Sequence, residues 1–440
     1  MMCDAMRVWL AVRWTVALKS LAFASALAAA AEVTASDVDA RANKEREFKS
    51  YLLRAGPQVL KQYVRQRDRM SALRAQVSAR EAAGQSTACS HQILAEASWL
   101  ASSVMKPDRI EKRLDDLEHV LAHPDMELRA EQQDPSDGSW GACHDEWFFR
   151  VNATYDHLTT PSNRAVRPRY RLRVFDRVNS PQKLQAYFES LAVSDLPGAG
   201  IDHRRELNES LANLMRLILR GEPAYYPWHA NLKAAIMELI LHRLRNPSTG
   251  WWGERYARNG HIEFVDDLSI TFHVISCLNG DVPNLAPAMD HLLAVKDLNY
   301  PIGWLEDGQY SNHNNMDVVT LFGFGWRDMD DAQRGESAVE IQKMLDWCLR
   351  DSLQPDGSFA PDAGTSDSLE ESNSWGVRFL ERIGFFDPQK RFWTDQSFAQ
   401  AVRIRERLIG YIEKHLTTGG AGGAYYEGDL ERLRAARPGN

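Results

Sequence analysis

Residues 250–253 of this chain read Gly-Trp-Trp-Gly, and a glycine followed closely by an aromatic residue returns twice at nearly constant spacing. The second copy is Gly303-Trp304, and the third is Gly357-Ser358-Phe359. The steps between the glycines are 53 residues (303 − 250) and 54 residues (357 − 303). A fixed period of this length is the signature of a repeated supersecondary unit.

An acidic residue follows each copy at the start of an apolar segment: Asp267, Asp317 and Asp367, at intervals of 50 residues (317 − 267 and 367 − 317). A carboxylate in this position is typical of a helix N-terminus, because it binds free backbone N–H groups and interacts favourably with the helix dipole. We therefore expect each repeat to consist of a helix, a Gly-aromatic turn and a second helix.

A period near fifty residues with two helices per repeat resembles the α/α toroid, in which helical hairpins close into a ring and the inner helices surround a cavity. The phrase Gln-Pro-Asp-Gly-Ser-Phe at 354–359 is similar to the turn phrase of terpenoid cyclases and protein prenyltransferases. Six-hairpin glycosidases and many polysaccharide lyases share that architecture. The resemblance covers roughly residues 205–427 and implies a mainly α fold, an (α/α) toroid of helical hairpins, without assigning a chemistry.

The rest of the chain divides by pattern into three further segments. Residues 1–31 carry positive charges and then an apolar run that ends in Ala29-Ala30-Ala31, which predicts a cleaved signal peptide. Residues 32–130 form an N-terminal helical region, residues 131–200 a mixed extended segment, and residues 201–440 the toroid-like catalytic region. Alternating apolar residues around Phe149 and Leu172 predict a short extended or β insertion near 145–177.

Composition excludes several classes of protein. The 440 residues are 44% hydrophobic and 25% charged, with a formal net charge of −8, which excludes a disordered chain, a coiled coil and a general nucleic-acid binder. The signal peptide implies a periplasmic or secreted protein with no stable membrane insertion after cleavage. In that compartment Cys89, Cys143, Cys277 and Cys348 allow three disulfide pairings, and buried thiols are the alternative.

The densest polar cluster lies at 304–317. Its stretch Asp307-Gly308-Gln309-Tyr310-x-x-His313-x-Asn315 resembles a segment of the hyaluronate and chondroitin lyases, where an Asp-Gly-Ser-Phe turn precedes a catalytic His and an Asn follows two residues later. The resemblance implies that His313 carries the catalytic imidazole. The family's catalytic Tyr would fall near Phe322, which has no hydroxyl, so Tyr310 would have to replace it.

The chemistry that these residues suit is β-elimination of a uronate sugar. It needs a group that neutralises the carboxylate, a base that takes the C5 proton and an acid for the leaving oxygen. We expect His313, Tyr310, Asn315 and Asp267 to be catalytic, and Asn312 and Asp307 to bind substrate. The alternative for His313 is a structural turn histidine bonded to the backbone.

The Trp pair and its neighbours form a second candidate group. Trp251, Trp252 and Trp304 suit stacking on sugar rings, Arg255 suits pairing with a substrate carboxylate, and Glu254 is a further contact. The alternatives are core packing for the Trp residues and a helix cap for Asp267, and for Asp267 we favour the cap. Hydrolysis would instead use paired carboxylates among Glu254, Asp266, Asp267, Glu306 and Asp307.

Two charged clusters complete the survey. Six arginines gather between Arg164 and Arg177, and they suit either a polyanion or the solvated edge of a strand. The acids between Asp362 and Glu371 suit the first turn of a helix, and neither a calcium loop nor Cys/His metal spacing is present.

The reading that we favour is a polysaccharide lyase acting on an extended acidic carbohydrate, with no cofactor and no metal. A glycoside hydrolase, a terpenoid-cyclase-like toroid and a non-catalytic envelope binding protein are the alternatives.

Overall fold

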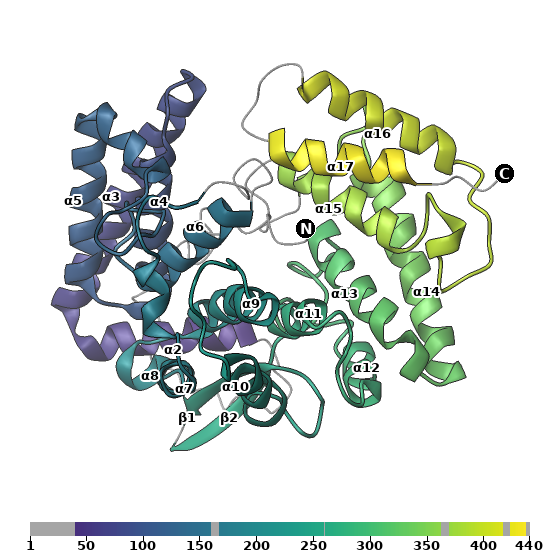
Figure 1. Ribbon diagram of the computed structural model, residues 1–440, viewed down its shortest axis with the longest axis horizontal. Helices are drawn as coiled ribbons and strands as arrows, with labels where there is room; N and C mark the ends of the chain where they lie inside the picture. Colours follow the sequence, from purple (N-terminus) through teal and green to yellow (C-terminus); the bar gives the residue numbers. More distant parts are fainter. Residues whose placement is uncertain (1–39, 160–166, 259, 362–368, 417–422, 437–440) are drawn as a thin grey trace. The chain divides into compact units, whose positions relative to one another are not determined.

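The structure is a computed structural model, and it describes residues 40–159, 167–258, 260–361, 369–416 and 423–436 (Figure 1). Over these residues the chain is mainly helical, which confirms the predicted mainly α class. Within the same ranges no helix is both long enough and apolar enough to span a bilayer. The chain divides into two compact units. The N-terminal unit comprises Ala40–Arg245 and Gly253–Val265, and the C-terminal unit comprises Asn246–Trp252 and Asp266–Asn440.

The N-terminal unit is built from helices of very different length. They are α2 (Ala40–Ala55), α3 (Pro57–Ala82), α4 (Ala88–Trp99), α5 (Pro107–Ala122), α6 (Trp147–Thr159), α7 (Pro181–Ser190), α8 (Leu196–Ala199), α9 (Arg204–Arg220) and α10 (Leu232–Glu238). Helices α3, α4 and α5 pack against one another, and α6 packs against α9. Pro57 and Pro107 each begin a helix, where the absent N–H has no helical partner to lose.

One disulfide joins helix α4 of this unit to the segment that precedes α6. Cys89, in the first turn of α4, is bonded to Cys143, 54 residues later in the chain. Cys277 and Cys348 remain thiols. The buried carboxylate of Glu127 accepts hydrogen bonds from the backbone N–H groups of Cys89 (2.8 Å) and Ser90 (3.0 Å), so it caps the helix beside the disulfide.

The predicted extended insertion near 145–177 is wrong. Residues Trp147–Thr159 form α6, and Arg173–Arg177 form a short 3-10 turn. Phe148, Val151 and Tyr155 are buried at helical spacing, and six alternating residues are too few to distinguish that period from a strand. The backbone near residue 170 forms hydrogen bonds as a strand would, but its partner is a side chain. Gln133 binds both the N–H and the C=O of Tyr170, at 2.8 and 2.9 Å, in place of a neighbouring strand.

The sheet of the described chain lies elsewhere. Strands β1 (Gly253–Arg258) and β2 (His261–Asp266) form a two-stranded hairpin. The sequence between them is Asn259-Gly260, the strongest short-range signal for a tight hairpin turn, and Gly260 has a φ of +77°. Sequence analysis passed over this signal.

The described part of the C-terminal unit continues as a series of helices joined by turns. They are α11 (Leu268–Cys277), α12 (Ala286–Ala294), α13 (Asn312–Gly325), α14 (Asp331–Trp347), α15 (Leu369–Arg382), α16 (Ala401–Leu416) and α17 (Gly423–Ala435). Helices α11, α13, α15 and α17 pack in that order, each against the next (Figure 1). Helices α12, α14 and α16 alternate with this series along the chain and pack beside it. Helix α12 contacts α13 and α14, and α16 contacts α17.

Each Gly-aromatic turn is tied to the following helix of this series by one polar side chain. Thr271 of α11 accepts a hydrogen bond from the Trp252 N–H (3.0 Å). Asn314 of α13 donates to the Trp304 carbonyl (3.0 Å). In the same way, Asn373 of α15 accepts a hydrogen bond from the Phe359 N–H (2.6 Å). The three repeats are therefore alike in structure as well as in sequence.

Steric crowding explains why glycine occupies these turns. A Cβ on Gly303 would lie 2.3 Å from the Val295 carbonyl oxygen and 2.4 Å from that of Leu298. Gly357 has a φ of +96°, and its Cβ would lie 2.8 Å from the Arg407 carbonyl oxygen. The backbone approaches so closely at both turns that no other residue fits without movement of the main chain.

Candidate functional site

Buried polar residues of the C-terminal unit gather at the starts of α11, α13 and α15. Asp267 is the N-cap of α11 and accepts a hydrogen bond from the Ile270 N–H at 2.9 Å, which confirms the capping interpretation. Ser311 caps α13 by accepting from the Asn314 N–H at 3.1 Å. The expectation that Asp317 opens its helix is wrong, since α13 begins five residues earlier. Asp367 lies outside the described residues.

Asp317 is instead buried inside α13, where only 1% of it is exposed. Burial, and secondarily the nearby carboxylate of Asp267, raise the pKa of Asp317 well above its ordinary value. Its Oδ1 has no hydrogen-bond partner within the described structure. Both polar atoms of the fully buried Asn315 amide also lack one there. Unsatisfied buried polar groups of this kind are costly, and they concentrate at functional positions.

His313 lies in the first turn of α13 and is 8% exposed. Its Nδ1 is 2.9 Å from Oδ1 of Asn314. The Asn314 amide is oriented by its other end, because Nδ2 donates to the Trp304 carbonyl. Oδ1 therefore faces the imidazole and can only accept, so Nδ1 carries the proton. In the neutral ring this leaves Nε2 unprotonated, which is the form that a general base requires.

Two aromatic residues enclose the imidazole edge-on. The ring of Tyr300 lies 5.7 Å from it and the ring of Trp375 in α15 lies 4.7 Å from it, centroid to centroid. Sequence analysis missed Tyr300, although it precedes the predicted cluster by only a few residues. It also assigned no role to Trp375. Phe322, the position where the lyase pattern would place a tyrosine, packs against Trp304 in the core.

The other predicted residues of this cluster lie around His313 in different roles. Tyr310 is half-buried against Trp347 of α14, at 6.2 Å between rings, and burial is the main cause that raises its pKa. Asn312 donates a hydrogen bond to the Ser352 hydroxyl at 2.7 Å. Asp307 is exposed in the turn before α13, with a φ of +52°.

The three tryptophans that were predicted to stack on sugar are fully buried. Trp251, Trp252 and Trp304 each expose 0% of their surface, and Trp251 Nε1 donates to the Ala288 carbonyl at 2.9 Å. A ring without exposed surface has no face for a ligand, so their placement corresponds to the core-packing alternative. Trp251 and Trp252 belong to the C-terminal unit, whereas Glu254 and Arg255 belong to the N-terminal unit.

Glu254 lies in a buried charged cluster of the N-terminal unit. Lys44 Nζ is 2.6 Å from Glu254 and 3.3 Å from Asp202, and the Tyr256 hydroxyl lies within hydrogen-bond distance of both carboxylates. Burial, followed by the neighbouring Asp202, raises the pKa of Glu254 to about 8. Arg255 bonds the Arg243 carbonyl at 2.9 Å. These contacts hold β1 to α2, and they suit a structural ion cluster.

The arginine-rich segment does not form one face of a strand. Arg177 lies over the rings of Trp147 and Tyr187, at 4.8 and 5.0 Å, and Arg171 pairs with Asp176 at 3.7 Å. Arg164 and Asp362 lie outside the described residues.

No family model, no curated protein and no solved structure matches this chain. Among the residues that the structure describes, no group of three or more His, Cys, Asp or Glu side chains could hold a metal ion. The site must therefore be interpreted from its own geometry, and His313 with its neighbours is the part of it that has an oriented proton acceptor.

Proposed function

We propose that this protein is an exported carbohydrate-active enzyme, a polysaccharide lyase that cleaves a uronate-containing polymer by β-elimination. The observation that carries the proposal is the Asn314 amide, which orients His313 with Nδ1 protonated beside the ring of Tyr300. The serial packing of α11, α13, α15 and α17 supports the finer expectation of an α/α toroid. The Cys89–Cys143 disulfide supports a periplasmic or secreted location.

The proposed reaction assigns one role to each residue. Nε2 of His313 takes the C5 proton of the uronate, and the electrons of that C–H bond form the C4=C5 double bond. The C4–O bond breaks, and the Tyr300 hydroxyl protonates the leaving oxygen. The substrate carboxylate, whose charge grows during proton removal, is assigned to the Asn315 amide, whose polar atoms lack a partner in the described structure. Because this amide is fully buried, the contact requires that the start of α13 opens to the substrate. No cofactor takes part in these steps.

The test is a panel of uronate-containing and neutral polysaccharides, with absorbance from the unsaturated product as the readout. We expect His313→Ala to reduce product formation by a factor of about 10² or more, since a positioned general base contributes 10²–10⁴. His242→Ala is the matched control, because that imidazole is largely exposed and remote in sequence. Equal rates for His313→Ala and the wild type would exclude the mechanism.

Tyrosine substitutions decide which phenol acts. Tyr300→Phe keeps the ring that packs on His313 and removes only the hydroxyl, whereas Tyr310→Phe changes the residue that the sequence pattern favours. We expect the first substitution to abolish elimination and the second to preserve it. The reverse result would assign the acid to Tyr310.

Hydrolysis by paired carboxylates is the second candidate. The observation that favours it is the position of Asp317, where burial, and secondarily the neighbouring Asp267, raise the pKa of this carboxyl group and favour its protonated form. Release of reducing ends without the absorbance of an unsaturated sugar, together with its loss in Asp317→Asn, would select this candidate over elimination.

A further inference from the structure

A cavity of about 360 Å³ lies in the N-terminal unit, where α4, α5 and the 3-10 turn Pro124–Glu131 meet the segment around Cys143. Its volume falls within the range of roughly 300–1,000 Å³ that is usual for small-molecule sites. None of the residues assigned to the proposed lyase reaction lines this cavity. The cavity therefore has no role in the chemistry proposed above.

One part of the cavity lining is apolar, and polar atoms make up the rest. The Cys89–Cys143 disulfide, Ile93 and Val120 are buried there, and Ala142 and Met126 are half-buried beside them. A wall of this kind accepts a hydrocarbon or aromatic body, which gains free energy by leaving water.

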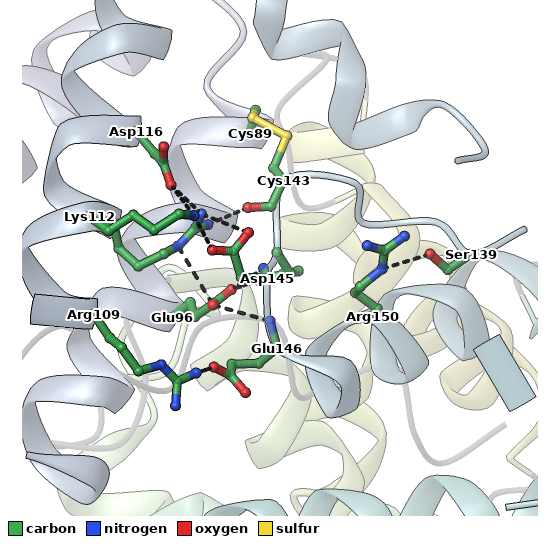
Figure 2. Close-up of polar contacts among 12 residues, drawn as sticks. Cys89, Glu96, Arg109, Lys112, Asp116, Ser139, Cys143, Asp145, Glu146 and Arg150 are labelled. Atoms are coloured by element: carbon green, nitrogen blue, oxygen red, sulfur yellow. Dashed lines mark hydrogen bonds and ion pairs between the residues drawn. A yellow bond between two sulfur atoms is a disulfide. The ribbon is translucent and has the colours of Figure 1, made fainter. Parts of the chain in front are cut away.

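Most charges at the rim neutralise one another. Lys112 pairs with Asp116 (3.2 Å) and Asp145. Arg113 pairs with Asp116 (2.7 Å) and donates to the Cys143 carbonyl. Figure 2 shows Lys112, Asp116 and Asp145 gathered beside the disulfide, with the dashed contacts among them. Because both carboxylates are already paired, they have little attraction left for a cationic ligand.

Arg129 is different from the other rim residues. It lines the same cavity, it is exposed, and it forms no ion pair with any residue that the structure describes. A guanidinium without a partner beside an apolar wall attracts a carboxylate or sulfonate, to which it can donate two hydrogen bonds at once. His119, which also lines the cavity, adds a second polar group next to it.

We propose that this cavity binds a small organic monoanion that has an apolar body, with Arg129 holding the anionic group and the disulfide wall holding the body. The ligand class follows from the apolar part of the lining and from Arg129, the one lining cation without an ion-pair partner among the described residues. The site is independent of the proposed lyase reaction.

The test uses three probes of the same shape and different charge: 2-naphthoate, 2-naphthamide and 2-naphthylmethylammonium. Isothermal titration calorimetry with the whole protein should rank them naphthoate, then naphthamide, then the ammonium. We expect naphthoate to bind about tenfold more tightly than naphthamide, as for one charge-assisted contact. Tightest binding by the ammonium, equal binding of naphthoate and naphthamide, or no binding of naphthoate would overturn the proposal.

Variants locate the binding within the cavity. Arg129→Gln should weaken naphthoate about tenfold and leave naphthamide unchanged, and Arg129→Lys should retain part of the preference. Arg350→Gln is the matched control, because Arg350 is an exposed arginine of the other unit. Ala142→Phe should fill the cavity and weaken both probes. An Arg129→Gln protein that melts like the wild type and still prefers naphthoate would refute the assignment.

Discussion

The buried carboxyl group of Asp317 should make the stability of this protein fall as pH rises. Its pKa in the folded protein lies well above the ordinary value of 3.8, because burial and Asp267 both disfavour the charged form. Below pH 3.8 the group is protonated in the folded and unfolded chains alike, and its favourable contribution is fully present. Between pH 3.8 and the folded pKa only the unfolded chain has lost this proton, so the contribution decreases as pH rises and is lost once pH has passed the folded pKa.

The substitution Asp317→Asn isolates the effect, because asparagine has nearly the shape of the protonated acid and carries no charge at any pH. The difference in unfolding free energy between variant and wild type should rise in favour of the variant by about 1.4 kcal/mol per pH unit above 3.8. It should level off at the folded pKa, so the pH of the plateau measures that pKa. A constant offset from the new amide does not change this slope.

The assay is urea unfolding of both proteins at half-unit intervals from pH 4.5 to 8.5, with the midpoint and slope compared at each pH. Asp331→Asn is the control, since Asp331 is fully exposed, and its difference from the wild type should stay flat. A flat difference for Asp317→Asn as well would show that Asp317 ionises normally. Burial inside α13 would then not disfavour the charged form of Asp317.

Two further predictions concern the backbone and the disulfide. Gly303→Ala should destabilise the protein by about 2 kcal/mol or more, because the new Cβ meets two carbonyl oxygens. Gly335→Ala, at a helical position with open space, should stabilise the protein by about 0.5–1 kcal/mol. Similar melting temperatures for the two variants would contradict this prediction. Replacing Cys89 and Cys143 together by serine should lower the free energy of unfolding by about 4 kcal/mol, which is the chain-entropy value for a loop closed across 54 residues. Urea unfolding measures this loss. A loss below about 1 kcal/mol would show that the loop is already constrained without the disulfide.

Sequence periodicity predicted the helical class and the repeats because both depend on local spacing. The Gly-aromatic elements could be found because Gly303 and Gly357 satisfy steric demands that no other residue meets. The cap at Asp267 was predictable for the same reason, since a cap acts within one helical turn. Local patterns of this kind keep their meaning whatever the surrounding fold.

The features that sequence analysis missed depend on contacts between distant segments. The helix Trp147–Thr159 was taken for a strand because its aromatic residues are buried on several sides. The contact of Tyr300 with His313 depends on how the chain turns before α13, which no spacing rule reports. Burial of the Trp251-Trp252 pair also could not be read locally, because aromatic residues serve a core and a ligand cleft equally well.

The hairpin β1–β2 completes the N-terminal unit from a position downstream of its other residues. Glu254 supplies the carboxylate nearest to Lys44, and Arg258 pairs with Glu47 of α2 at 2.5 Å. During synthesis, α2 therefore lacks its partners Glu254 and Arg258 until about two hundred further residues have been translated. A fragment that stops at Arg245 would leave the Lys44 ammonium without Glu254, so a truncated N-terminal unit should be prone to proteolysis at its first helix.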